Sequence, residues 1–268
     1  MNLPIAPEIE QEIQDALDRI EQDQDVKVLF ACESGSRAWG FASTDSDYDV
    51  RFIYVRRPDW YLDIDLEHKR DVIELPINDD LDVSGWDLRK ALQLYRKSNP
   101  PLLEWLGSPI IYREEFSIAQ QMRDLASTCY SPIACQYHYY KMAKGNYKDY
   151  LKEEMVKLKK YLYVLRPVLG VIWLEQDMGV VPTEFQKLVD GVIDDPELEQ
   201  AIERLLEIKM SSTEKDVGPR MPVINEFLER ELSRMEAQEF ERKVGNCPLE
   251  KLNQLFRGAL AEVWHVGT

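Results

Sequence analysis

The sequence predicts an α+β protein, with a mixed-sheet head over residues 1–115 and an all-helical domain over residues 116–268. Two observations support this division. Before Phe116, apolar runs of strand length recur and turn residues separate them. Beyond Phe116 the strand signals fade, and candidate helices, several opened by proline, follow one another. A chain of 268 residues is long enough for a core in each part.

The head is expected to begin with an amphipathic helix over residues 7–22, because isoleucine and leucine recur at helical spacing from Ile9 to Ile20. This helix would cover one face of the sheet. A buried strand is expected over residues 26–31, followed by a Gly-Ser turn, a short helix over 36–39 and a second strand over 47–55.

An antiparallel hairpin is expected next, with strands over residues 69–75 and 81–84 joined by a turn at Asn78–Asp80. Asp87 is a candidate N-cap for a helix over residues 88–97, and residues 109–112 form a candidate edge strand. Later helices are expected over 117–125, 133–143, 147–166, 167–175, 182–192, 196–210, 222–237 and 248–263, with a loop over 211–216.

The charge balance limits the classes of partner. Lysine and arginine total 33 against 49 aspartate and glutamate residues, which gives a net charge of −16. Proteins that grip phosphate backbones without specificity need clustered cations, so this class is excluded, although nucleic acid at one locally basic site is not. Apolar runs are too short to span a membrane, and the N-terminal residues lack a signal-peptide layout. We therefore expect a cytoplasmic protein with no membrane partner; the oligomeric state is not predicted.

The four cysteines form no Cys-x-x-Cys pair, and the three histidines are scattered without metal-ligand spacing. A chain of this size needs no disulfides. We expect each of these residues to be a packed or surface side chain, and zinc chemistry to be absent.

The stretch with the clearest chemistry runs from Gly35-Ser36 to Asp47-Tyr48-Asp49. Because strand side chains alternate between faces, Asp47, Asp49 and Arg51 should share one face of the second strand. Paired carboxylates repel each other unless a cation lies between them, and their hard oxygens suit Mg²⁺. A Gly-Ser turn can present backbone N–H groups to phosphates. Together these features indicate phosphoryl chemistry.

The string from Gly35 to Val55 resembles that of the YcgL-like predicted nucleotidyltransferases, some of which are RNA-repair-associated, within the DNA polymerase beta nucleotidyltransferase superfamily. The resemblance rests on Gly35-Ser36 and on Asp47-x-Asp49, eleven positions after Ser36 and between two strand-like runs. It extends more loosely over most of the chain. It implies a polymerase beta-like head followed by a helical domain that closes the nucleotide cleft.

The resemblance further implies a two-metal transferase that binds a nucleoside triphosphate and uses two Mg²⁺ ions, with Mn²⁺ as an alternative. The nucleoside monophosphate would pass to a hydroxyl acceptor, and an RNA end is the acceptor that the family suggests. Transfer to a protein or small-molecule hydroxyl stays open, as does a non-catalytic nucleotide-binding regulatory protein with the same fold.

Asp47 and Asp49 are the predicted metal ligands and catalytic residues. The superfamily uses a third carboxylate on a neighbouring strand, for which we choose Asp82; Asp80 on the same face is its rival. Gly35, Ser36 and Arg37 are predicted to bind the nucleotide. An exposed Arg37 paired with Asp45 is an equal alternative, and Arg51, either near the carboxylates or solvated, is not assigned.

A second candidate region is locally basic and aromatic, over residues 138–147 and 157–167. Tyrosine rings can stack on a base, and lysine or arginine can bind phosphates. Both segments look like stretches of the same family. Lys160 and Arg166 are predicted to bind the nucleotide, and the alternative is a core stripe of aromatics with solvated lysines.

Overall fold

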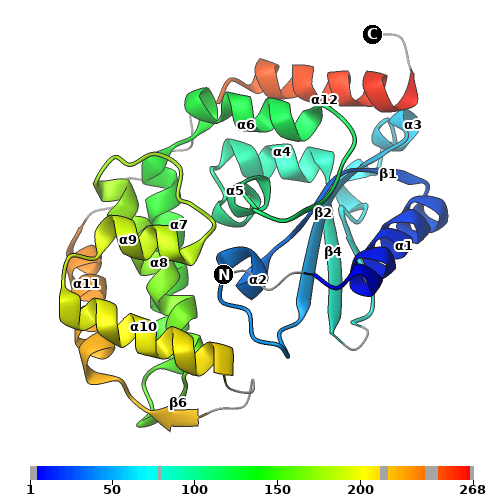
Figure 1. Cartoon of the computed structure of the whole chain (residues 1–268). Helices are drawn as coiled ribbons and strands as arrows, with labels where there is room; N and C mark the ends of the chain where they lie inside the picture. The colour runs from blue at the N-terminus through cyan, green and yellow to red at the C-terminus, as the bar shows by residue number, and fades with distance from the viewer. Residues whose placement is uncertain (1–4, 78–79, 212–216, 239–246, 266–268) are drawn as a thin grey trace. The chain divides into compact units, whose positions relative to one another are not determined.

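The computed structural model of the chain describes residues 5–77, 80–211, 217–238 and 247–265 (Figure 1). The residues fall into two compact units. One, the sheet unit, comprises Leu3–Gly35, Asp47–Tyr130 and Gly245–Thr268; the other, the helical unit, comprises Ser36–Ser46 and Ser131–Val244. The sequence placed a boundary after residue 115, which lies inside the sheet unit. The structure also groups the short segment after the Gly-Ser turn with the helical residues.

The sheet unit contains a five-stranded mixed sheet in the order β3-β4-β2-β1-β5. The strands are β1 Val26–Glu33, β2 Tyr48–Arg56, β3 Val72–Glu74, β4 Leu81–Asp87 and β5 Ile111–Glu114. β2 pairs with β1 antiparallel and with β4 parallel, and β3 with β4 antiparallel. The predicted α+β class, the hairpin and the edge strand are confirmed, while part of the predicted turn (78–79) lies outside the described residues.

Helices cover both faces of this sheet (Figure 1). The helices of the sheet unit are α1 Pro7–Gln24, α3 Pro58–Tyr61, a 3₁₀ turn Leu66–His68, α4 Leu88–Arg96, α5 Pro100–Leu106, α6 Ile118–Cys129 and α12 Leu249–Trp264. On one face, Leu17 and Ile20 of α1 pack in one buried cluster with Val50 and Phe52 of β2. α4, α5 and α6 contact the strands, and α12 contacts α4 and α6. The predicted cap is confirmed, because the Asp87 carboxylate accepts from the Arg89 backbone N–H at 2.8 Å.

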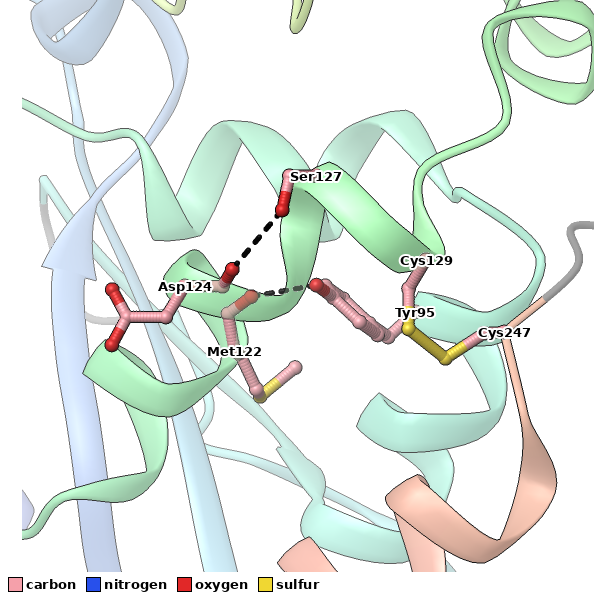
Figure 2. Close-up of a disulfide and its surroundings, with 6 residues drawn as sticks. All are labelled: Tyr95, Met122, Asp124, Ser127, Cys129 and Cys247. Atoms are coloured by element: carbon pink, nitrogen blue, oxygen red, sulfur yellow. Dashed lines mark hydrogen bonds between the residues drawn. A yellow bond between two sulfur atoms is a disulfide. The ribbon is translucent and has the colours of Figure 1, made fainter.

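A disulfide joins Cys129, at the end of α6, to Cys247, just before α12 (Figure 2). The two cysteines are 118 positions apart, and Ser131–Val244 of the helical unit lies between them in the chain. Tyr95 lies beside the disulfide and donates its hydroxyl to the Met122 carbonyl at 2.6 Å (Figure 2). The expectation of no disulfide is therefore wrong, because this pairing depends on the packing of α6 against α12, which no local spacing reveals.

The helical unit is built on the antiparallel neighbours α7 and α8, which α9 and α11 contact in turn. Its elements are α7 Pro132–Tyr150, β6 Met155–Lys157, α8 Lys159–Glu175, α9 Phe185–Val192, α10 Pro196–Ser211, β7 Val217–Pro219 and α11 Pro222–Ala237, and α2 Gly35–Trp39 begins at its junction with the sheet unit. Among the described helices, none is both long and apolar enough to cross a membrane. Most of the loop predicted over 211–216 lies outside the described residues.

One predicted helix, Tyr147–Arg166, is wrong, because α7 ends at Tyr150 and β6 precedes α8. Pro167 was expected to open a new helix but lies inside α8. A proline there cannot donate to the carbonyl of Tyr163, four residues earlier. The Asn146 side chain of α7 donates to that carbonyl at 2.9 Å, so the helix continues.

Candidate active site

Two of the predicted carboxylates lie side by side in the sheet unit. Asp49 of β2 and Asp82 of β4 are direct partners in the parallel ladder. Both side chains are partly exposed, by 27% and 32%. Neighbouring strands are about 4.8 Å apart, so two ionised carboxylates at this register would repel each other strongly.

Arg51 relieves this repulsion. Its Nη2 donates to Asp49 Oδ1 at 3.0 Å and to Asp82 Oδ2 at 2.7 Å. Its Nη1 donates to the carbonyls of Asp82 and Val50, at 3.0 and 3.1 Å. The sequence left Arg51 between two alternatives, and the structure places it at the carboxylates.

Gly35 allows the turn to approach Asp49. Its φ is +57°, and a Cβ at this position would lie 2.0 Å from Asp49 Oδ2. Any other residue would therefore clash with the carboxylate as well as adopt a strained backbone. Next to it, the Ser34 N–H donates to the Asp49 carbonyl at 2.8 Å. The glycine is thus needed at the point where the turn meets β2.

Glu33, which the sequence interpretation missed, holds the backbone of Asp49 by a hydrogen bond. It is fully buried at the end of β1. Its Oε1 accepts from the Asp49 backbone N–H at 2.8 Å, and its Oε2 accepts from the Tyr112 hydroxyl. The available signal was an acidic residue closing an apolar strand just before Ser34-Gly35. The adjacent Cys32 thiol is no nucleophile, because burial raises its pKa well above the ordinary range.

The other predicted ligands lie at the start of the two strands. Asp47 is exposed and precedes β2 directly, and Asp80 is exposed, with its carbonyl accepting from the Tyr48 N–H at 2.7 Å. In the parts of the chain that the structure describes, no three His, Cys, Asp or Glu side chains are grouped to hold a metal. The hard oxygens of Asp49 and Asp82 suit Mg²⁺, but Arg51 is bonded to one oxygen of each. A cation that binds both carboxylates would compete with this guanidinium.

The predicted nucleotide-binding residues that follow Gly35 belong to a compact turn. The Ser36 carbonyl accepts from the N–H groups of Gly40 and Phe41, at 3.1 and 3.0 Å. Arg37 is buried rather than exposed, and its Nη2 donates to the Ser46 carbonyl at 2.7 Å. This bond ties the beginning of the segment 36–46 to its end.

Arg166 and Lys160, which the sequence treated alike, have different surroundings. Arg166 is 2% exposed, lies with its guanidinium carbon 4.9 Å from the Trp39 ring centre, and donates to the carbonyls of Pro182 and Thr183. Lys160 is half-buried, with Nζ 4.3 Å from the ring centre of Tyr150. Nucleotide binding by either residue stays a prediction.

Lys209 is a second residue that the sequence interpretation missed. It is buried in α10, and its Nζ lies 2.6 Å from Ser43 Oγ and 3.2 Å from Ser46 Oγ. Ser46 Oγ also accepts from the Ser43 N–H at 2.9 Å. α10 gave only the pattern of a charged amphipathic helix, so no local signal indicated this contact. Lys209 and Arg166 together fasten the segment 36–46 to the helices of its unit.

Comparison with known proteins assigns the chain to a family. The model of the family described as "RlaP: RNA repair pathway DNA polymerase beta family" matches residues 9–258. The chain belongs to this family. The chain is also 49% identical over 260 residues to "Uncharacterized protein YcgL" of Bacillus subtilis (strain 168), which covers 97% of this chain and 99% of that protein. The resemblance seen in the sequence is confirmed.

The chain also matches, at low similarity, the solved structure of the nucleotidyltransferase-like protein from Exiguobacterium sibiricum 255-15. It shares 13% sequence identity with this chain, the TM-score is 0.33, and the match covers 95% of this chain and 90% of that protein. Both values are too low to relate the two proteins in function.

Proposed function

We propose that this protein is a metal-dependent nucleotidyltransferase that moves a nucleoside monophosphate from a nucleoside triphosphate to a hydroxyl acceptor, an RNA end. One observation carries the proposal: Asp49 and Asp82 are paired across parallel strands, beside a glycine at which a Cβ would lie 2.0 Å from the Asp49 carboxylate. Membership of a polymerase beta family supports the same activity. The description of that family as an RNA repair pathway family favours RNA as the acceptor.

In the proposed reaction, the acceptor oxygen attacks the α-phosphorus, the bond from that phosphorus to the bridging oxygen breaks, and pyrophosphate leaves. Mg²⁺ would be held by Asp49 and Asp82, with Asp47 two positions earlier, and would supply charge neutralisation at the phosphates. Asp82 is the candidate base for the acceptor proton. Gly35 and Glu33 set the backbone position of Asp49, and positioning of this kind is a large part of phosphoryl-transfer catalysis.

The test is incubation of the protein with Mg²⁺ or Mn²⁺ and each α-labelled nucleoside triphosphate, with RNA, DNA and protein acceptors in parallel. We expect label on RNA, abolished in Asp49→Asn and in Asp82→Asn. Asp124→Asn is the matched control, because Asp124 is an exposed acid of α6 whose carboxylate accepts a hydrogen bond from the Gln120 side chain. Label on a protein acceptor alone would replace the RNA part of the proposal, and no label on any acceptor would refute catalysis.

A second function has one observation in its favour. Among the described residues no three acidic side chains converge, and a guanidinium bridges the two that do. A nucleotide-binding protein without catalysis would have such a site. It would bind a nucleoside triphosphate in titration calorimetry and transfer no label in the experiment above.

A further inference from the structure

An exposed line of lysines runs along α7 of the helical unit, in a chain whose net charge is −16. Residues 131–160 hold seven lysines and three acidic residues. On α7, Tyr137, Lys141, Lys144 and Lys148 follow one another at intervals of four, three and four positions, which places them on one helix face over a length of about 16 Å. Lys152 follows just after the helix ends. We call these five residues the α7 face.

Most cations of this face are available to an anion. Lys141, Lys148 and Lys152 are exposed, and none of the three forms an ion pair with an acidic residue in the described part of the chain. Lys144 pairs with Glu236 of α11. By contrast, many other surface cations are already paired, as Arg57 is with Asp25.

The two acidic residues that line a groove beside the α7 face, Glu229 and Glu236, are themselves engaged. A groove of about 250 Å³ between α7 and α11 is lined by Lys144, Lys148, Lys152, Tyr147 and residues of α11 that include Glu229 and Glu236. Glu229 accepts from Tyr147 and Arg220, and Glu236 from Lys144. The hydrogen bond from Tyr147 lowers the pKa of Glu229, and that from Lys144 lowers the pKa of Glu236. Within the described residues, neither Lys148 nor Lys152 of this groove forms an ion pair.

Local helix energetics do not account for this arrangement. Lysines at three and four positions' separation repel each other and destabilise a helix by a few tenths of a kcal/mol per pair. A local arrangement that opposes stability points to a function. Aromatic rings accompany the charges, since Lys141 Nζ lies 5.3 Å from the ring centre of Tyr137.

We propose that the α7 face binds the phosphate backbone of single-stranded RNA, the acceptor strand of the proposed transfer. The inference rests on the proposed function for the choice of RNA, and on the charge, exposure and spacing of the lysines for the place of binding. Lys141, Lys148 and Lys152 bind phosphates of the strand. The acidic balance of the rest of the chain then restricts RNA to this face.

The experiment measures fluorescence anisotropy of a labelled single-stranded RNA of about 12 nucleotides at several salt concentrations from about 50 to 200 mM. Each phosphate contact on a single strand contributes about −0.7 to the slope of log K against log salt. Lys141→Gln/Lys148→Gln/Lys152→Gln should therefore make the slope less steep by about 2, and weaken binding about a hundredfold at ~0.1 M salt.

The matched control removes the same charge elsewhere, by Arg96→Gln/Lys97→Gln/Lys251→Gln, at three exposed positions of the sheet unit. Its affinity should change no more than about threefold, because none of these three residues belongs to the α7 face and salt screens the general loss of charge. A third variant with arginine at all three α7 positions should bind like the wild type, which separates loss of charge from loss of folding.

Unchanged affinity in the glutamine variant, equal weakening in the control, or no binding of RNA by the wild type would each overturn the inference. Label transfer assayed in parallel separates the two proposals. Transfer to a non-RNA acceptor without RNA binding would refute the α7 face and the choice of RNA as acceptor but leave the catalysis standing. RNA binding with the expected slopes and no transfer would refute only the catalysis.

Discussion

Replacing Arg51 with methionine should lower the free energy of unfolding of the metal-free protein and raise its affinity for divalent cations. Methionine keeps most of the side-chain length but removes the guanidinium that bonds to Asp49 and Asp82. Without it, the two carboxylates repel each other in the absence of a cation. A divalent ion then binds without first displacing an internal competitor.

The geometry sets the size of both effects. Two unit charges about 5 Å apart at an effective dielectric constant of ~20 repel by about 3 kcal/mol, and partial exposure reduces this value. A charge-assisted hydrogen bond contributes about 1.5–3 kcal/mol, again less where water reaches it. With Arg51, Asp49 and Asp82 exposed by 19%, 27% and 32%, we expect a net loss of about 2 kcal/mol in the free energy of unfolding.

A loss of this size should lower the metal-free melting temperature by about 4–8 °C. It should raise the affinity for Mn²⁺ about tenfold or more, since each 1.4 kcal/mol corresponds to a factor of ten. Calorimetric titration with Mn²⁺, together with melting curves with and without the ion, measures both. Arg57→Met is the matched control, because it breaks an exposed ion pair with Asp25 and should leave the Mn²⁺ affinity unchanged. A lower melting temperature with unchanged or weaker Mn²⁺ affinity would refute competition at these oxygens.

Two further outcomes follow from other parts of the sheet unit. Burial raises the pKa of Asp87 from 3.8 to about 6, so folding favours the protonated acid, and its share of the free energy of unfolding should fall by about 2 kcal/mol as pH rises from ~4 to ~6. Urea unfolding of the wild type and of Asp87→Asn, in which asparagine still caps the helix, should show this fall in the free energy of unfolding in the wild type alone. The same pH dependence in both proteins would contradict the prediction. Reduction of Cys129–Cys247 should lower the free energy of unfolding by up to about 5 kcal/mol, the loop-entropy value for 118 residues, while Cys135→Ser should have no such effect. Alkylation of four thiols in unreduced, unfolded protein would show that the bond is absent.

The elements around the Gly-Ser turn were predictable because their signals are local. An apolar run, a turn and an alternating strand specify β1, α2 and β2, and the parity of β2 places Asp49 and Arg51 on one face. Pairing between distant segments leaves no such pattern. β6 and β7, about sixty positions apart, were missed for this reason, as were the Lys209 contact with Ser43 and the disulfide.

The sequence predicted the acidic residues of the candidate site better than the residues that hold them in position. Residue types and spacing predicted Asp47 and Asp49, and the resemblance to the polymerase beta superfamily predicted Asp82. The role of Glu33 depends on burial beneath Asp49, and that of Arg51 depends on the register of β2 against β4. Both are properties of the folded sheet. From the sequence alone, the role of Arg51 stayed undecided, and nothing distinguished Glu33 from the many other acidic residues.

Burial also changes how the cations of the helical unit can be tested. Arg166 is enclosed and bonded to two backbone carbonyls, so neutralising it leaves those carbonyls without their donor and disturbs the packing around Trp39. A loss of nucleotide affinity in Arg166→Gln would therefore follow from altered folding of the segment 36–46 just as well as from a lost phosphate contact. Lys160 is half-buried with its ammonium against aromatic rings, so its neutralisation removes a charge with a smaller structural effect. Of the two residues that the sequence grouped together, only Lys160 can distinguish a nucleotide ligand from a structural residue.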